Sequence, residues 1–302
     1  SDLTTAKAMA NTFTRTAVFA VFLSIVAWYF RPVVPPEEIN YVDYIITPES
    51  PPFDPFVVGE NNCQLVQAYF PKDALEELLP DQLLIPDDAT MAKHYPNTLL
   101  KPEAHPFMIS FCHGSKIHDV DTNIDVPEQE EIMFMFPVVT GNDNLDYRLC
   151  SYVPVLYLDS FIGVLGGLVF GLRKEYHPGM KHSQSKAARF WRLEGTFDAS
   201  FEIHHENSAL EKLPHFMEQT YLNPFVTVSY PMPFAKMAFY RARVYPRTII
   251  SSTETFRWNY KGTVVSQGDD TQSVYTDYGF TMSKLMNPIE FWKLPIDNNE
   301  EL

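Results

Sequence analysis

The chain has 302 residues, of which 45% are hydrophobic and 14% aromatic, so it can bury a sizeable core and is not a disordered protein. Its formal net charge is −15 and no basic cluster is interleaved with aromatic residues, which excludes nucleic acid as an expected partner. The three cysteines fit neither a metal motif nor a dense disulfide framework. We therefore expect Cys63, Cys112 and Cys150 to be separate core thiols.

A membrane anchor is predicted near the N-terminus. Residues 17–30 read AVFAVFLSIVAWYF and end in Trp28 and Tyr29, side chains that favour the headgroup boundary of a bilayer. Fifteen helical residues rise about 22 Å, less than the ~30 Å hydrocarbon core, so residues 12–16 join the helix or the bilayer thins. We predict that residues 16–30 contact lipid as one membrane helix. An interfacial helix and a buried soluble helix are the alternatives.

The segment after the anchor is acidic and rich in proline. No Lys or Arg occurs between Pro32 and Pro71, whereas Asp, Glu and Pro accumulate there, which is typical of an extended tether. The chain therefore divides into an anchor, a tether, a strand-rich domain and an acidic tail, over residues 1–31, 32–60, 61–290 and 291–302. This arrangement predicts a single-pass membrane protein.

Basic residues indicate the orientation of that anchor. Lys7 and Arg15 precede it and Arg31 alone follows it closely, so the positive-inside tendency places the N-terminus on the cytoplasmic, matrix or stromal side. The domain then faces the opposite compartment. The organelle stays open, and mitochondrial and plastid membranes are both compatible with the pattern.

After Asn61 the pattern changes to short alternating runs rich in β-branched and aromatic residues, separated by Pro, Gly, Asn and Asp. We predict strands within residues 65–70, 107–112, 132–139, 154–160, 196–203, 225–231, 237–245 and 248–258. Runs of this kind indicate a mostly antiparallel sheet that curls or closes. Two helices are predicted in the domain, one over residues 72–80 and one over residues 207–222 that Pro214 interrupts.

Several common motifs are absent from the sequence, among them Gly-x-Gly-x-x-Gly, the Walker loop, Gly-x-Ser-x-Gly and His-Glu-x-x-His. The sequence therefore predicts no nucleotide cofactor and no metal. The acidic residues between Asp119 and Glu130 have the spacing of a calcium-binding EF-hand loop, but Ile124 stands where the turn needs glycine and both flanks are predicted strands. We expect a solvated hairpin connection there, and surface or hydrogen-bonded histidines at His113 and His118, without zinc.

The segment most informative about function is VPVLYLDSFIGVLGGLVFGLRKEY, residues 153–176. A strand is expected to end at Asp159, a glycine-rich apolar stretch follows, and Arg173 and Lys174 are the first charged residues after it. A lysine at the edge of such a stretch loses hydration, which lowers its pKa and gives a neutral amine that attacks carbonyl groups. A surface lysine after a turn is the alternative.

This segment resembles the signature of the acetoacetate decarboxylase family, in which Gly-Arg-Glu-x-x-Gly-aromatic-Pro-Lys-Lys follows a strand. Gly166 and Gly171 occupy the two glycine positions, Arg173 the proline position, and Lys174 the Schiff-base lysine, without a gap. Two further segments agree in order: the family's Asp-Ala-Leu helix at residues 73–80, and its active-site glutamate before a Pro-Val pair at Glu131. The resemblance covers about residues 50–260.

The resemblance implies a β-dominated α+β fold, a cone-shaped antiparallel barrel, behind the N-terminal membrane helix. It also implies substrate-binding positions at Asn61, Met108 and Arg173. Asn61 stands at or near the family's arginine, Met108 near a second acidic position, and Glu175 at its second lysine. The loss of the arginine removes the clamp for a substrate carboxylate, and a carboxylate beside the lysine tends to raise its pKa.

These observations favour a Schiff-base lyase that breaks a C–C or C–O bond of a keto compound. Lys174 forms the imine, and Glu131 orients the substrate or transfers a proton. The rival function is a non-catalytic accessory subunit that packs against other membrane subunits or a second copy of the chain. A binding protein for an apolar ligand in the barrel mouth is the third. Whether Lys174 lines an open cavity distinguishes them.

Overall fold

The computed structural model describes residues 55–121, 123–140, 149–164, 174–204, 210, 212–229, 236–284 and 289–290. The predicted membrane helix, most of the predicted tether and the acidic tail lie outside these residues. Among the described residues, no helix is long and apolar enough to cross a bilayer. The first described strand begins at Pro55, within the segment predicted as tether.

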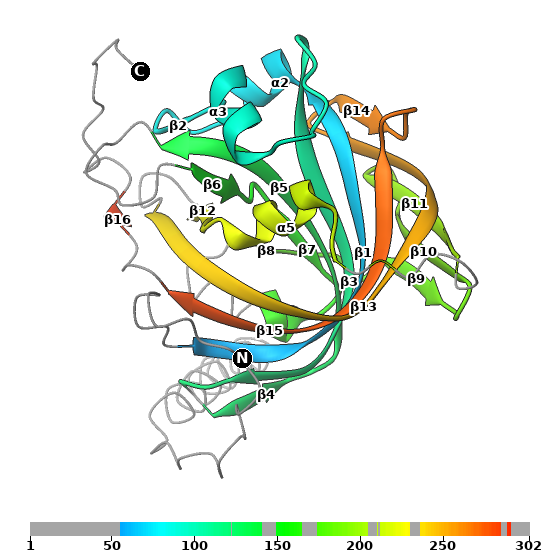
Figure 1. Ribbon diagram of the computed structural model, residues 1–302. Coiled ribbons are helices and arrows are strands. Elements are labelled where there is room, and N and C mark those ends of the chain that lie inside the picture. Colours follow the sequence, from blue (N-terminus) through cyan, green and yellow to red (C-terminus); the bar gives the residue numbers. More distant parts are fainter. Residues whose placement is uncertain are drawn as a thin grey trace, which may run out of the picture.

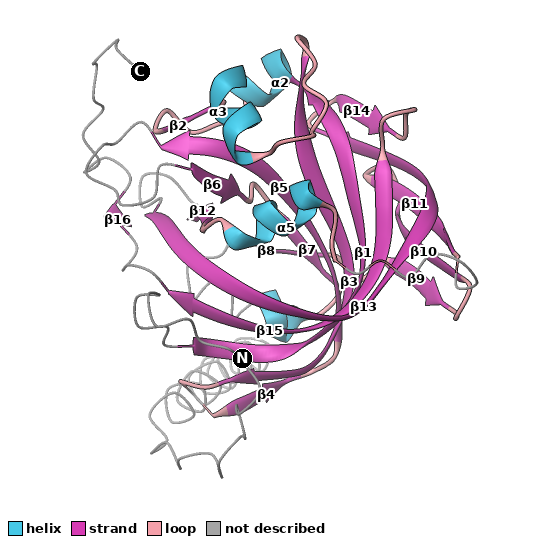
Figure 2. Cartoon of the chain, viewed as in Figure 1, coloured by secondary structure: helices cyan, strands magenta, loops and turns pink. Residues whose placement is uncertain are grey.

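Strands make up most of the described chain, and the helices are short (Figure 2). In chain order the described strands are β1 (Pro55–Pro71), β2 (Leu83–Leu84), β3 (Ala104–Asp119), β4 (Ile124–Val126), β5 (Gln129–Thr140), β6 (Leu149–Tyr152), β7 (Leu156–Leu158), β8 (Lys174–Tyr176), β9 (Lys181–Gln184), β10 (Ala188–Leu193), β11 (Phe197–Ile203), β12 (Phe225–Ser229), β13 (Lys236–Tyr260), β14 (Thr263–Ser266), β15 (Gln272–Lys284) and β16 (Ile289–Glu290). The described helices are α2 (Lys72–Glu76), α3 (Asp88–His94) and α5 (His215–Leu222), and residues 161–164 are also helical. The predicted β-dominated fold is confirmed.

The sheet curls into a half-barrel (Figure 1). Its strand order is β12-β6-β5-β3-β1-β15-β13-β11-β10-β9, and the pairings along the path are antiparallel except for β12 with β6. Strand β12 also pairs with the first half of β13, so one short strand links both arms of the path. The prediction of a mostly antiparallel, curled sheet is therefore confirmed.

The central strands bury both of their faces because side chains alternate along a strand. On β5, Ile132 and Phe134 belong to one core cluster, whereas Met133 and Met135 belong to another. The first cluster is aromatic, with Trp258 stacked on Phe134 at 3.7 Å between ring centroids, and the second packs against α5. One step along β5 therefore moves a side chain from one core to the other.

The long strand β13 corrects one strand prediction. Residues 237–245 and 248–258 were expected to form two strands with a break at Pro246, but one strand runs through both. The pairing with β15 shifts register between Pro246 and Thr248. A local irregularity in the pairing therefore accommodates the proline, which has no N–H to donate, and the strand continues.

Both predicted helices are present in shorter form, and a third was missed. Helix α2 begins at Lys72, and α5 begins directly after Pro214. Helix α3 was not predicted, although the carboxylate of Asp87 accepts a hydrogen bond from the backbone N–H of Thr90 at 2.6 Å and caps its N-terminus. Asp87 was the available signal for this short helix.

The cysteine prediction is wrong for two of the three residues. Cys63 on β1 lies directly opposite Cys112 on β3, their Cα atoms are 4.1 Å apart, and the two sulfur atoms form a disulfide. Cys150 is buried and forms no disulfide in the described part of the chain, in agreement with the prediction of a core thiol. Spacing along the chain did not reveal the disulfide, because it depends on the register of two strands joined by a long connection.

The acidic loop after β3 is a hairpin connection, as predicted. Strand β4 folds back on the end of β3, with Asp119 opposite Ile124. Asn123 adopts a positive φ of 55° in the turn, a conformation that asparagine tolerates better than most residues. Strands flank this loop on both sides, unlike the two helices that flank an EF-hand loop.

Candidate functional site

Lys174 and Glu131 line one cavity, with a volume of about 160 Å³. Short strands position the lysine: Lys174 lies beside Leu156 in the parallel β7–β8 pair, and Leu156 lies opposite Met133 of β5. Glu131 is two residues before Met133 and faces the same side of β5. Three adjacent strands therefore bring the predicted imine-forming lysine and the predicted proton-transfer group to one wall.

The Lys174 amine is partly buried and makes one hydrogen bond to the backbone. Its Nζ donates a hydrogen bond to the backbone carbonyl of Gly163 at 3.2 Å. Burial lowers the pKa of Lys174, and the neighbouring carboxylate of Glu131 opposes this shift. A lowered pKa leaves more free amine near neutral pH than an exposed lysine has, and the free amine is the nucleophilic form.

Gly163 fits this position because it has no side chain. A Cβ at residue 163 would lie 2.2 Å from Oε1 of Gln129 and 3.1 Å from Cδ1 of Leu158. Gln129 is itself almost completely buried, so its amide has little room to move. The glycine therefore allows the helical turn at residues 161–164 to approach the sheet closely enough for its carbonyl to meet Lys174.

Glu131 has the opposite shift. Burial raises the pKa of this carboxyl group, Lys174 lowers it, and Glu130 raises it further. The two members of the pair are therefore both shifted toward their neutral forms, amine and carboxylic acid. Such a pair can pass a proton between an amine-bound substrate and the carboxyl group.

A cluster of neutral polar groups lies in the same cavity. The hydroxyls of Tyr221, on α5, and Tyr278, on β15, are 3.0 Å apart, and Nδ2 of Asn61 donates to the Tyr278 hydroxyl at 3.3 Å. Burial raises the pKa of Tyr278 to about 12 and that of Tyr221 well above its usual value, so both hydroxyls stay protonated at neutral pH. They are hydrogen-bond donors beside the Lys174–Glu131 pair.

The structure brings together some of the predicted site residues and not others. Asn61 lines the cavity with Lys174 and Glu131. Met108 is completely buried in the core cluster beside α5 and is not among the described residues that line the cavity. Arg173 lies outside the described residues. Sequence reasoning missed Tyr221 and Tyr278, which no local motif marks.

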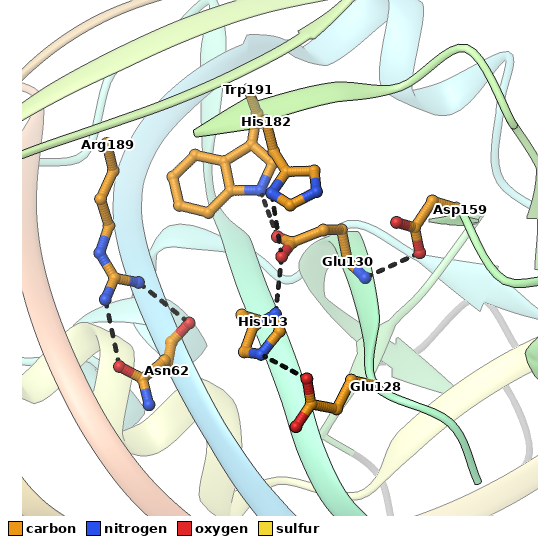
Figure 3. A network of polar contacts seen from close by, with 8 residues as sticks. All are labelled: Asn62, His113, Glu128, Glu130, Asp159, His182, Arg189 and Trp191. Carbon is orange, nitrogen blue, oxygen red and sulfur yellow. Dashed lines mark hydrogen bonds and ion pairs between the residues drawn. The ribbon is translucent and has the colours of Figure 1, made fainter. Parts of the chain in front are cut away.

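Glu130 faces the other side of β5 and holds a separate polar network (Figure 3). Its carboxylate accepts hydrogen bonds from Trp191 Nε1 at 2.8 Å and contacts Nδ1 of His113 at 2.7 Å and Nδ1 of His182 at 3.2 Å. Its backbone N–H donates to Asp159 at 2.8 Å. The two adjacent glutamates therefore have different surroundings, one a cavity and the other a packed set of ring nitrogens.

The histidines named in the sequence lie at hydrogen-bonded positions. His113 contacts Glu130, and Nδ1 of His118 lies 3.0 Å from the carboxylate of Asp125. The prediction of hydrogen-bonded histidines at these two positions is confirmed. Within the part of the chain that the structure describes, no three side chains form a group suited to a metal ion.

Solved structures share this architecture. The enduracididine biosynthesis enzyme MppR, complexed with the condensation product of pyruvate and imidazole 4-carboxaldehyde, matches with a TM-score of 0.51 and 12% identity, over 79% of this chain and 91% of that one. Acetoacetate decarboxylase from Legionella pneumophila matches with a TM-score of 0.51 and 12% identity, over 85% of this chain and 99% of that one. The chain has the acetoacetate decarboxylase-like fold. Neither a known sequence family nor a curated protein matches it, and at this identity the likeness concerns the fold alone.

Proposed function

We propose that this domain forms an imine between Lys174 and a keto compound and uses Glu131 to move a proton at the carbon next to it. The observation that carries the proposal is that both groups line the same cavity, each shifted toward its neutral form by burial. A lysine with free amine, an adjacent proton-transfer group and space for a ligand are the three requirements of this chemistry.

The proposed steps follow from the two groups. The neutral Lys174 amine adds to the carbonyl carbon, a C–N bond forms, and the carbonyl oxygen leaves as water after it has gained two protons. The protonated imine then accepts the electron pair released when a bond to the neighbouring carbon breaks. Glu131 takes the proton when that bond is C–H, or returns a proton to the same carbon after another group has left.

The structural neighbours are compatible with this proposal. One is named as acetoacetate decarboxylase. The other is bound to a condensation product of pyruvate, and pyruvate is a keto compound. Both proteins therefore handle ketone carbons on the same fold. Because both structures are only 12% identical to this chain, they support a ketone as the class of probe and nothing more specific.

The test is reductive trapping of the imine. Incubation with hexan-2-one and cyanoborohydride should add the ketone's carbon skeleton to Lys174, because hydride reduces the iminium carbon and makes the link permanent. Peptide mass spectrometry locates the label. Since burial lowers the pKa of Lys174, labelling should persist as pH falls toward 7, whereas exposed lysines are already protonated well above that pH.

Two variants complete the trapping experiment. Lys174→Met should abolish the site-specific label, and Lys116→Arg is the matched control because that side chain is 75% exposed and is not among the described residues that line the cavity. Labelling of Lys174 no faster than that of exposed lysines across the pH range would contradict the proposal. The domain would then be left as a non-catalytic interaction module or an apolar-ligand binder.

We also propose that residues 16–30 hold the domain at a membrane, with the domain on the side opposite the N-terminus. The apolar run supports the anchor, and the Cys63–Cys112 disulfide supports the orientation because structural disulfides persist in oxidising compartments rather than in the cytosol. The proposed partners are lipid and other membrane subunits or a second copy of the chain.

Full-length protein should remain with membranes through carbonate and high-salt washes, because burial of the apolar run outweighs electrostatic attachment. A variant lacking residues 1–35 should appear in the supernatant as a folded protein. Membrane pelleting followed by immunoblotting measures both. Release of the full-length chain by carbonate alone would exclude a spanning helix.

A further inference from the structure

The wall around Lys174 is mostly carbon. Phe56 and Val57 of β1, Met133 of β5, Leu156 of β7 and Phe280 of β15 line the cavity from different strands. Removing a ligand's apolar surface from water against such a wall is favourable, roughly in proportion to the area buried. A cavity of about 160 Å³ matches a ligand of about the size of benzene, which fills engineered apolar cavities of ~150 Å³.

Charge in the cavity disfavours an anionic ligand. Among the described residues that line it, Lys174 is the single cation, and because its nitrogen is bonded to the substrate in the imine, the lining holds no second cation for a carboxylate at the far end of the substrate. The carboxyl groups in the lining are Glu131 and Asp119, and neither offers a positive partner to a substrate carboxylate. An anion taken out of water without a partner loses several kcal/mol of hydration that nothing in this described lining replaces.

The remaining polar groups are neutral. Asn61 and Gln129 lie opposite Gly114 on its two neighbouring strands, and a Cβ at residue 114 would lie 2.8 Å from Cδ1 of Ile117 and 3.2 Å from Oδ1 of Asn61, so these side chains pack closely over the glycine. Within the described residues, Oδ1 of Asn61 and Oε1 of Gln129 are buried without a hydrogen-bond partner. These two amide oxygens are acceptors and can meet a ligand O–H, such as the hydroxyl that forms when the amine adds to the ketone, whereas the Tyr221 and Tyr278 hydroxyls can donate to an oxygen. None of these four groups carries a charge for a carboxylate.

We propose that the substrate is an uncharged ketone with an apolar remainder, and that the cavity rejects keto acids. This inference rests on the proposed imine at Lys174 and specifies the compound that forms it. The apolar wall binds the carbon chain, the tyrosine hydroxyls donate to an oxygen, and the described lining offers an anion no cation other than the reacting lysine.

The experiment compares two methyl ketones of matched length that differ in charge at the far end, hexan-2-one and 4-oxopentanoate. Each is incubated with the full-length protein and cyanoborohydride, and labelling of Lys174 is normalised to that of the exposed Lys116, which corrects for intrinsic reactivity. Hexan-2-one should label Lys174 at least about tenfold faster, since the carboxylate has no cationic partner in the described lining.

A variant that adds a cation tests the cause of the preference. Asn61→Arg should raise the rate of Lys174 labelling by 4-oxopentanoate, relative to hexan-2-one, severalfold, because arginine supplies a cationic partner for the carboxylate. Asn61→Leu, which introduces an uncharged side chain, should not raise it. Near-ultraviolet circular dichroism checks that each variant is folded, and the wild-type comparison stands without them. Equal or faster labelling by 4-oxopentanoate would overturn the substrate class while leaving the imine in place. Absence of Lys174 labelling by both ketones would overturn the proposed function itself, and this inference with it.

Discussion

Glu131→Gln should slow the exchange of a bound ketone's α-protons with solvent deuterium by about 10²–10⁴-fold, the usual contribution of a positioned acid–base group. In the proposed mechanism the imine at Lys174 acidifies those protons, and the carboxylate of Glu131 in the same cavity removes them. Glutamine keeps the size and hydrogen bonding of the side chain but accepts no proton. Exchange is followed by proton NMR of hexan-2-one in deuterium oxide.

The pH dependence of this exchange has a definite sign. Burial raises the pKa of Glu131, so the carboxylate form that removes protons is lost as pH falls through a range above the ordinary value of 4.5. Exchange should therefore decline at a higher pH than for an exposed glutamate. In Glu131→Gln this decline should disappear together with most of the exchange.

Glu175→Gln is the matched control for Glu131→Gln. Glu175 is the residue directly after Lys174 on β8, so its side chain points to the opposite face of the strand, and it is not among the described residues that line the cavity. Its replacement should leave exchange within about twofold of the wild type. An equal loss in both variants, or a loss of trapping in Glu131→Gln as large as the loss of exchange, would contradict the assigned role of Glu131.

Glu130→Ala should lower the free energy of unfolding by about 3–5 kcal/mol, the usual effect of breaking a buried ionic network. Glu130 is 1% exposed, and its carboxylate serves the Trp191 indole N–H and the rings of His113 and His182 (Figure 3). Alanine leaves the buried indole N–H of Trp191 without its acceptor, removes the partner of the two more exposed histidine rings, and leaves a cavity where the carboxylate was. Urea denaturation measures the loss.

The neighbouring acidic side chain supplies the control for Glu130. Glu128 also contacts His113, at 3.8 Å, but is 71% exposed, and exposed pairs contribute less than about 1 kcal/mol. Glu128→Ala should therefore unfold at nearly the same urea concentration as the wild type. A change of less than about 1 kcal/mol in Glu130→Ala would show that the network of Figure 3 adds little to stability.

Local patterns located seven of the sixteen described strands and missed the others, among them β10 and the central strand β15. Those located are β1, β3, β5, β7, β11, β12 and β13. The short apolar runs at residues 107–112 and 132–139 predict β3 and β5, because a run of this length bounded by turn residues is typical of a strand buried on both faces. Helix α2 follows from leucine spacing before Pro80, and α5 from Pro214, which no helix interior accepts. The run of residues 16–30 predicts an anchor for the same reason of local composition.

The surroundings of Lys174 could be predicted in part from the sequence. The apolar, uncharged stretch before it predicts a desolvated amine, and burial does lower its pKa. The matching of Glu131 to the lysine depended on resemblance, because residues 43 positions apart meet only through the pairing of β5 with β7 and β7 with β8. Met108 shows the limit of matching sequence positions alone. It was matched to a substrate-binding position of the family, but in the structure it lies in a packed core.

What only the tertiary structure decided are contacts between strands that are distant in the chain. Asn61 reaches Tyr278 across 217 residues, and Cys63 reaches Cys112 across 49, because β1 lies between β15 and β3 in a register that no single segment specifies. Composition and local pattern by themselves indicated a β-rich domain with a buried core, an apolar run near the N-terminus and a lysine at the edge of an apolar stretch. The curl of the sheet decided which polar groups share the cavity with that lysine, since a shift of one residue in any strand would turn them to its other face.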